Sequence, residues 1–91
     1  MNSTPPREFV GVVTELDISG WGPNSAQLEF SLTPQSGQPV TFVMEFDAVP
    51  QMFAAGATML TMAFEKKMPI RAIFPANQTG TPRISGLKLP A

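Results

Sequence analysis

Residues 8–18 read Glu-Phe-Val-Gly-Val-Val-Thr-Glu-Leu-Asp-Ile, and this stretch decides the fold. From Val10 onward its even positions are apolar or threonine, which is the two-residue period of a strand with one buried face. Gly11 interrupts the pattern and predicts a bulge or a sharp bend. A bent strand can belong to both halves of a curled sheet, so the stretch favours a small β-barrel. The face expected to be buried comprises Val10, Val12, Thr14, Leu16 and Ile18.

Two further strands follow with the same alternation. Residues 20–25 combine two glycines, a proline and an asparagine around Trp21, which is a loop signal, and the alternation resumes over residues 26–32. The turn sequence Pro-Gln-Ser-Gly-Gln-Pro at residues 34–39 then leads into a third strand over residues 40–46. We expect the first two strands to pair as a hairpin.

A short helix is predicted after the third strand. Asp47 is a suitable N-cap for a helix over residues 48–55, since Pro50 is tolerated in a first helical turn. Gly56 would then end this helix.

The remaining residues predict two more strands. Residues 60–64 alternate between apolar and more polar side chains, and this fourth strand is expected to continue over residues 70–74. The turn-rich residues 75–82 separate it from a last strand over residues 83–89.

This order, with a bent first strand and a helix before the fourth strand, resembles the OB-fold. The resemblance rests on Val-Gly-Val at residues 10–12, Phe-Ala-Ala-Gly at residues 53–56 and Ile-Ser-Gly-Leu-Lys-Leu at residues 84–89. It implies a mainly β fold, a small five-stranded OB-like barrel with one short helix between strands 3 and 4. An SH3-like barrel fits the same pattern with more strain. The OB resemblance implies a binding surface on strands 2 and 3, flanked by the loops at residues 20–25 and 75–82.

The expected domain organisation is simple. The chain has 91 residues, a size at which one domain can bury a core without disulfides. We expect residues 1–7 to be a disordered N-terminal tail and residues 8–91 to form a single β-barrel domain. No N-terminal segment combines basic residues with an apolar run, and no apolar stretch reaches the roughly 20 residues of a membrane span, so we expect a cytoplasmic protein.

The composition excludes most catalytic chemistry. The chain contains neither cysteine nor histidine, which removes thiolate nucleophiles, Ser-His-Asp arrangements and imidazole-ligated zinc. Glu15 and Asp17 share a strand face, but a metal site needs several more oxygen ligands at one point. We therefore expect no enzyme activity, no metal and no cofactor.

Charge is distributed unevenly along the chain. Residues 1–64 carry six acidic residues and one basic residue, whereas residues 65–91 carry five basic residues and one acidic residue. These opposite charges either meet across strands or leave a basic patch on one side of the fold.

We expect an interaction or assembly module that associates with itself or with another protein. Apolar residues occupy odd strand positions that should face solvent, and strand-edge pairing into a dimer would cover them. The alternative is that the bend at Gly11 carries Phe9 and Val13 into the second half of the core. The predicted partner-binding residues are Phe9, Val13, Trp21 and Val43.

The second functional hypothesis is an accessory single-stranded nucleic-acid-binding protein. Trp21, between two glycines, is either a stacking platform or a lid over one end of the barrel. The outward positions of strands 2 and 3 include Glu29 and Glu45 and no aromatic residue, so a phosphate-binding surface would form elsewhere. The residues for this function are Trp21, Lys66, Lys67, Arg71 and Arg83.

Overall fold

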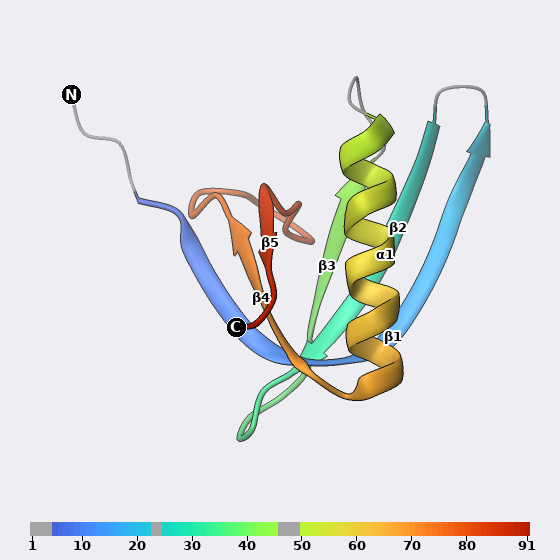
Figure 1. Cartoon of the computed structure of the whole chain (residues 1–91). Coiled ribbons are helices and arrows are strands. Elements are labelled where there is room, and N and C mark those ends of the chain that lie inside the picture. Colours follow the sequence, from blue (N-terminus) through green and yellow to red (C-terminus); the bar gives the residue numbers. More distant parts are fainter. Residues whose placement is uncertain (1–4, 23–24, 46–49) are drawn as a thin grey trace.

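The computed structural model describes residues 5–22, 25–45 and 50–91, which form five strands and one helix in the predicted order (Figure 1). Asp47, the predicted helix cap, lies outside these ranges, as do residues 1–4 of the predicted tail. Arg7, the last residue of the predicted tail, is the first residue of the first strand. The elements are β1 (Arg7–Gly22), β2 (Ser25–Thr33), β3 (Val40–Glu45), α1 (Pro50–Lys66), β4 (Pro69–Phe74) and β5 (Gly86–Lys88).

The sheet is built around β1. Its strand order is β3-β2-β1-β4-β5, and every neighbouring pair is antiparallel. Residues 7–12 of β1 pair with β4, and residues 12–22 pair with β2. This double pairing is what the predicted bend allows. A Cβ on Gly11 would lie 2.8 Å from the carbonyl carbon of Thr33, so only glycine lets β1 pass this close to the end of β2.

A β-bulge at Thr14 reverses the side of β1 that faces the core. Val13 pairs with Leu32 and Glu15 pairs with Ser31, so Thr14 is the extra residue on β1. Val13 is only 3% exposed, whereas Val10 is 39% exposed. The prediction that the even positions are buried was therefore wrong before the bulge, and beyond the bulge Ile18 is also 45% exposed. An extra residue shifts the two-residue alternation by one position, and this shift is invisible in the sequence pattern.

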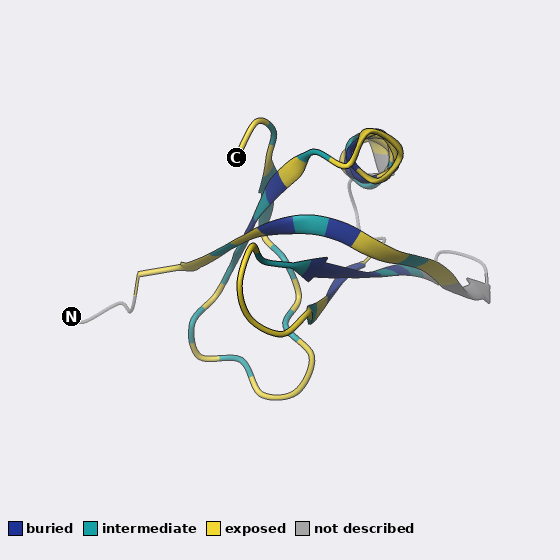
Figure 2. Cartoon of the chain, turned by 90° about the horizontal axis from the view of Figure 1, so that it is seen from below, coloured by how far each residue is buried: buried dark blue, intermediate teal, exposed yellow. Residues whose placement is uncertain are grey.

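Aromatic rings fill the centre of the core. The Phe42 ring has a centroid 5.6 Å from that of Phe30, 5.7 Å from that of Phe9 and 5.2 Å from that of Phe74. Such offset and tilted pairs contribute beyond the area they bury. Figure 2 shows that buried residues occupy the middle of the sheet and the side of α1 that faces it. The four rings thus connect β1, β2, β3 and β4.

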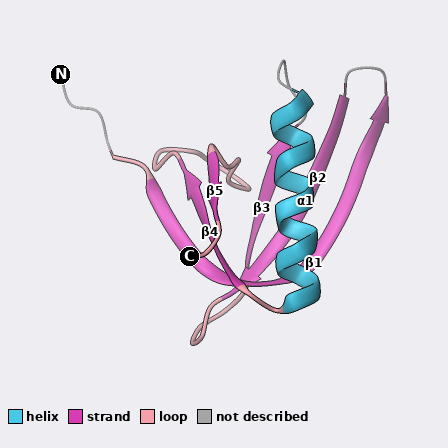
Figure 3. Cartoon of the chain, viewed as in Figure 1, coloured by secondary structure: helices cyan, strands magenta, loops and turns pink. Residues whose placement is uncertain are grey.

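The helix is longer than predicted, and the fourth strand starts later. Residues 60–64, predicted as strand, belong to α1, and β4 begins at Pro69 (Figure 3). Leu60 and Ala63 are fully buried, and their spacing from Gly56 is that of one helix face. Gly56 is not a helix stop. A Cβ there would lie 2.4 Å from Sδ of Met44, so the glycine lets α1 pack closely against β3.

The helix ends at Lys66, and the next residue, Lys67, adopts a left-handed conformation with φ of 54°. The backbone N–H of Met68 donates to the carbonyl of Ala63 at 3.0 Å, the bond that closes a Schellman motif. Glycine usually occupies this position, because a Cβ is unfavourable there.

The curled sheet is joined by a single bridge between its two ends. Val43 of β3 forms an isolated parallel bridge with Arg83, three residues before β5. The N–H of Val43 donates to the carbonyl of Pro82, and the N–H of Ile84 donates to the carbonyl of Val43, both at 2.9 Å. No ladder continues this bridge within the described residues. We call the space between residues 43–45 and residues 82–88 the seam. β5 itself spans three residues, fewer than the predicted 83–89.

We predict that Val13→Ala lowers the free energy of unfolding by roughly 2 kcal/mol, because two buried methyl groups are lost. Val10→Ala makes the same chemical change on the same strand, three residues away, and should cost under about 0.5 kcal/mol. Urea unfolding followed by circular dichroism measures both. Equal losses of unfolding free energy in the two variants would contradict the conclusion that the bulge at Thr14 changes which side of β1 faces the core.

We also predict that Lys67→Gly raises the free energy of unfolding by about 1 kcal/mol, because glycine adopts the left-handed conformation without strain. Lys66→Gly, one residue earlier and still in the helix, should lower it by up to about 1 kcal/mol. Thermal unfolding of the two variants should thus shift in opposite directions. A shift in the same direction would show that Lys67 does not hold the left-handed position after the helix.

Candidate functional site

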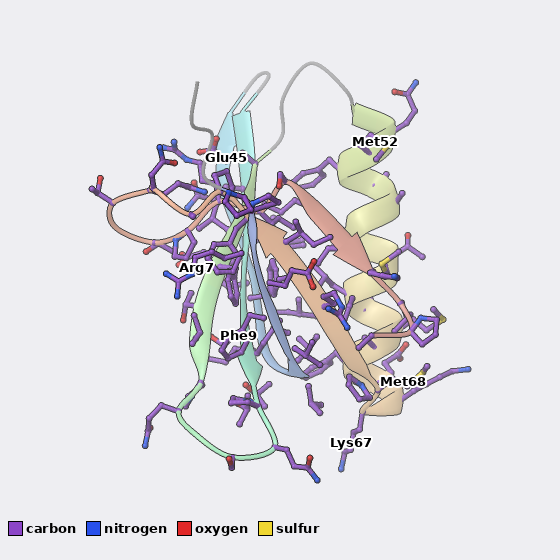
Figure 4. All side chains as sticks on the ribbon, turned by 90° about the vertical axis from the view of Figure 1, so that its left-hand side faces the viewer. Arg7, Phe9, Glu45, Met52, Lys67 and Met68 are labelled. Carbon is purple, nitrogen blue, oxygen red and sulfur yellow. The ribbon has the colours of Figure 1, made fainter. Side chains whose placement is uncertain are left out.

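Three of the predicted partner residues belong to the interior. Val13 and Val43 are 3% and 6% exposed, and Phe9 is half-buried against Phe42 (Phe9 is labelled in Figure 4). Val43 points to the outer side of β3, but residues 78–83 fold over it and bond its backbone. In this structure Val13 and Val43 offer almost no exposed surface to a partner, and Phe9 offers only part of its side chain. The bend and the bulge carry Phe9 and Val13 into the core, which was the alternative the sequence left open.

The fourth predicted residue, Trp21, lies in β1. The loop predicted over residues 20–25 is shorter than expected, because β1 extends to Gly22 and β2 begins at Ser25. The side chain of Trp21 lies outside the part of the structure that is described.

Two of the four predicted nucleic-acid-binding cations are engaged in ion pairs. Arg71 of β4 pairs with Glu8 of β1. Arg83 pairs with Glu45, with Nε 2.9 Å from Oε1. Lys66 and Lys67 are exposed at the far end of α1, so the four residues do not line one groove. Opposite charges therefore meet across elements, as one reading of the charge asymmetry predicted.

The outer face of β1 and β2 is acidic. Asp17 and Glu29 lie directly opposite each other, an arrangement that repels anions and is unfavourable in itself. Glu15 adjoins them and accepts a hydrogen bond from the buried Ser31 hydroxyl at 3.3 Å. Ser31 also bonds the Thr41 hydroxyl at 2.9 Å, which ties the three strands together on this face. Phosphate would be repelled from this surface. Among the described residues, no three or more acidic side chains lie close enough together to hold a metal ion.

A groove lies at the seam, between the first half of α1 and the edges of β3 and β5. Its volume is about 450 Å³, within the size range of ligand-binding clefts. Three methionine side chains dominate its lining, and Figure 4 shows two labelled members, Glu45 on β3 and Met52 on α1, at the same end of the molecule. We call it the Met groove, and its residues are Met44, Glu45, Met52, Phe53, Ala55, Gly56, Met59 and residues 83–87.

One rim of the Met groove is held by the loop before β5. The amide of Gln78 both donates to the carbonyl of Arg83 at 2.8 Å and accepts from its N–H at 2.9 Å. Arg83 in turn reaches Glu45 across the seam. Gln78 thus fixes the backbone segment that bridges to Val43.

A second exposed surface is the side of α1 that points away from the sheet. No charged residue occurs between Pro50 and Phe64. The hydroxyls of Thr58 and Thr61 donate to the carbonyls of Ala54 and Ala57 at 3.0 and 2.8 Å, so each hydroxyl is satisfied within the helix. Met62, on the same side, is 39% exposed. We call this surface the outer face of α1; it comprises Ala54, Thr58, Thr61 and Met62.

Sequence reasoning missed both surfaces. Residues 60–64 were assigned to a strand, and the helix was predicted to end at residue 55. The usable signal was the uncharged run over residues 50–64, because a surface helix of this length normally carries charges on its solvent side. Recognising that run as one helix would have revealed the outer face.

Comparisons with protein-family models, with curated proteins and with solved structures find no match for this chain. Within the described residues, no helix is long and apolar enough to cross a membrane.

We predict that Gln78→Ala speeds backbone amide exchange at Val43 and Ile84, because it removes the two hydrogen bonds between the Gln78 side chain and the backbone of Arg83. Amides in the β1–β2 ladder should keep their protection. The matched control is Gln35→Ala in the exposed turn before β3, which should change neither set. Unchanged exchange at Val43 in the Gln78 variant would show that the segment needs no such clamp.

Proposed function

We propose that this protein is a non-enzymatic module of the OB type that assembles through the outer face of α1, and that its partner there is a second copy of the chain. The observation that carries the proposal is an exposed helix face that is uncharged from residue 50 to residue 64 and whose threonine hydroxyls are already bonded.

The strand connections support the OB assignment. An OB-fold is a five-stranded, partly open Greek-key barrel. β1 pairs with both β2 and β4, β2 pairs with β3, and β4 pairs with β5. Extending the parallel bridge at Val43 would join β3 to β5 and complete the ring. The helix between β3 and β4 also fits that architecture.

The chemistry of the outer face favours a helix as its neighbour. Alanine and threonine present only short side chains and methyl groups there, so two such helices can approach closely and pack their backbones together. This face offers few hydrogen-bond donors to water, because the threonine hydroxyls already donate within the helix. Burying the face therefore leaves no donor of Thr58 or Thr61 unsatisfied.

An antiparallel pair of copies fits the charges at the helix ends. Glu65 and Lys66, the charged residues of α1, lie in its last turn. In a two-fold antiparallel arrangement each copy places them beside the uncharged start of the other helix, whereas a parallel arrangement would bring like charges together. Antiparallel helices also align their dipoles favourably.

A non-catalytic role agrees with the residues available. The chain has no cysteine or histidine, and the described residues include no metal-ligand cluster. Nucleic acid is the weaker candidate, since Arg71 and Arg83 are paired with carboxylates and the β1–β2 outer face is acidic.

We predict that the wild-type chain sediments as a dimer at tens of micromolar and that Met62→Glu sediments as a monomer, because a charge would be buried without a partner. Val10→Glu is the matched control, since Val10 is also 39% exposed but lies on β1. That variant should remain dimeric. A monomeric wild-type protein, or equal loss of dimer in both variants, would overturn the proposal.

A further inference from the structure

The second half of β1 forms a free edge of the sheet. β4 pairs with β1 only from Arg7 to Val12, whereas β2 pairs with it as far as Gly22. Beyond Val12, no strand of the described residues lies on the side of β1 that faces away from β2. Figure 1 shows this half of β1 at the right-hand margin of the sheet, with no strand beyond it.

The bridge at Val43 fixes which backbone groups of β2 point toward β1. Both the N–H and the C=O of Val43 bond the segment before β5, so both groups point away from β2. In an antiparallel ladder, the residue opposite Val43 must then direct its own N–H and C=O away from β3. That residue is Glu29, whose partner on β1 is Asp17. Asp17 therefore directs its backbone groups toward β2.

Leu16 and Ile18, on either side of Asp17, direct their backbone groups to the free edge. The reason is that N–H and C=O groups point to alternate sides along a strand, and the register is regular from Glu15 to Ser19. Among the residues described, no backbone hydrogen bond uses these four groups of Leu16 and Ile18. An extended segment that adds beside β1 would satisfy all four.

The side chains along this edge alternate between apolar and acidic. Leu16 and Ile18 face the core side, opposite buried residues of β2, and Ile18 is 45% exposed. Glu15 and Asp17 are exposed on the other side, with Glu29 directly opposite Asp17. Within the described part of the chain, none of these three carboxylates belongs to an ion pair. Their charge is thus available to a partner.

This charge argues against a second copy of β1 as the added strand. In the register that uses all four backbone groups, Leu16 of each copy pairs with Ile18 of the other, and two Asp17 side chains meet at the centre. Like charges directly opposite each other destabilise a ladder. Basic side chains at those positions would instead attract Asp17 and offset its repulsion by Glu29.

We propose that the free edge of β1 binds an extended segment of another protein in which apolar residues alternate with lysine or arginine. The segment adds as an antiparallel strand, with apolar side chains beside Leu16 and Ile18 and basic side chains beside Glu15 and Asp17. This site is separate from the outer face of α1, so peptide binding and dimerisation can fail independently.

The probe is the peptide Thr-Lys-Val-Lys-Val-Lys-Thr, labelled with fluorescein and measured by anisotropy. We expect saturable binding with a Kd below about 1 mM, and at least about tenfold weaker binding when glutamate replaces the lysines. Met62→Glu, which removes the proposed dimer, should bind the peptide within about twofold of the wild-type protein. Absence of saturable binding to both proteins would overturn the proposal.

Backbone methylation of the peptide tests strand addition without changing the protein. In antiparallel pairing, the residues opposite Leu16 and Ile18 direct their N–H groups to β1. Methyl groups on the two valine nitrogens should therefore weaken binding at least about tenfold, whereas methyl groups on the two outer lysine nitrogens should change it less than about threefold. Equal affinities of the two methylated peptides would rule out strand addition.

Amide exchange locates the added strand on the protein. In the free Met62→Glu variant, the amides of Leu16 and Ile18 should exchange rapidly, whereas that of Asp17 should be protected by the β2 ladder. Saturating peptide should slow exchange at Leu16 and Ile18 at least about tenfold. Protection of these two amides in the free protein, or no change on binding, would contradict the proposed site.

Asp17→Asn tests the charge assignment, and it should not harm folding because it relieves the repulsion by Glu29. We expect at least about fivefold weaker binding of the lysine peptide to this variant. Glu8→Gln is the matched control, since Glu8 is also exposed on β1 but lies where β4 occupies the edge. That variant should bind within about twofold of wild type. An equal loss in both variants would show that the peptide responds only to overall charge.

Discussion

The whole structure depends on the close passage of β1 over the end of β2 at Gly11 and on the bulge three residues later. One strand must pair with β4 through its first part and with β2 through its second part. The glycine supplies the space, and the extra residue at Thr14 resets the side-chain alternation. Phe9 and Val13, at odd-numbered positions, can then face the same core as Leu16, at an even-numbered position. Without the bulge, one half of β1 would present its polar side to the interior.

The way the sheet curls also creates its exposed apolar surfaces. β3 and residues 82–84 meet at a single bridge, and the two strand edges separate beyond it. The first half of α1 fills this opening from the side, with Gly56 against Met44. The Met groove lies in this opening, beside the first half of α1. The outer face of α1 remains on the opposite side of the same helix.

Much of the architecture followed from the sequence. Turn residues and two-residue alternation placed three strands, and the position of the helix between strands 3 and 4 was also correct. Local sequence patterns predicted the wrong element where the periods of a strand and of a helix fit the residues equally well. Leu60, Met62 and Phe64 alternate like a strand, yet Gly56, Leu60 and Ala63 share a helix face, and packing against Met44 favours the helix. The side of the sheet that Val13 faces depends on its pairing with Leu32, nineteen residues away, so no local sequence pattern predicts it. Val43 is buried by a loop some forty residues later in the sequence, and no local pattern predicts this burial either.

The most direct test of the account is the distance between two copies of α1. The chain has no cysteine, so Thr58→Cys introduces a single site for a nitroxide label at the centre of the outer face. Antiparallel helices packed at about 8–10 Å between axes should hold the two labels within about 20 Å of each other, which broadens the electron paramagnetic resonance spectrum. The account predicts this broadening and its loss on dilution with unlabelled protein. An unbroadened spectrum at a concentration where the protein is dimeric would show that the outer face of α1 is not the assembly surface.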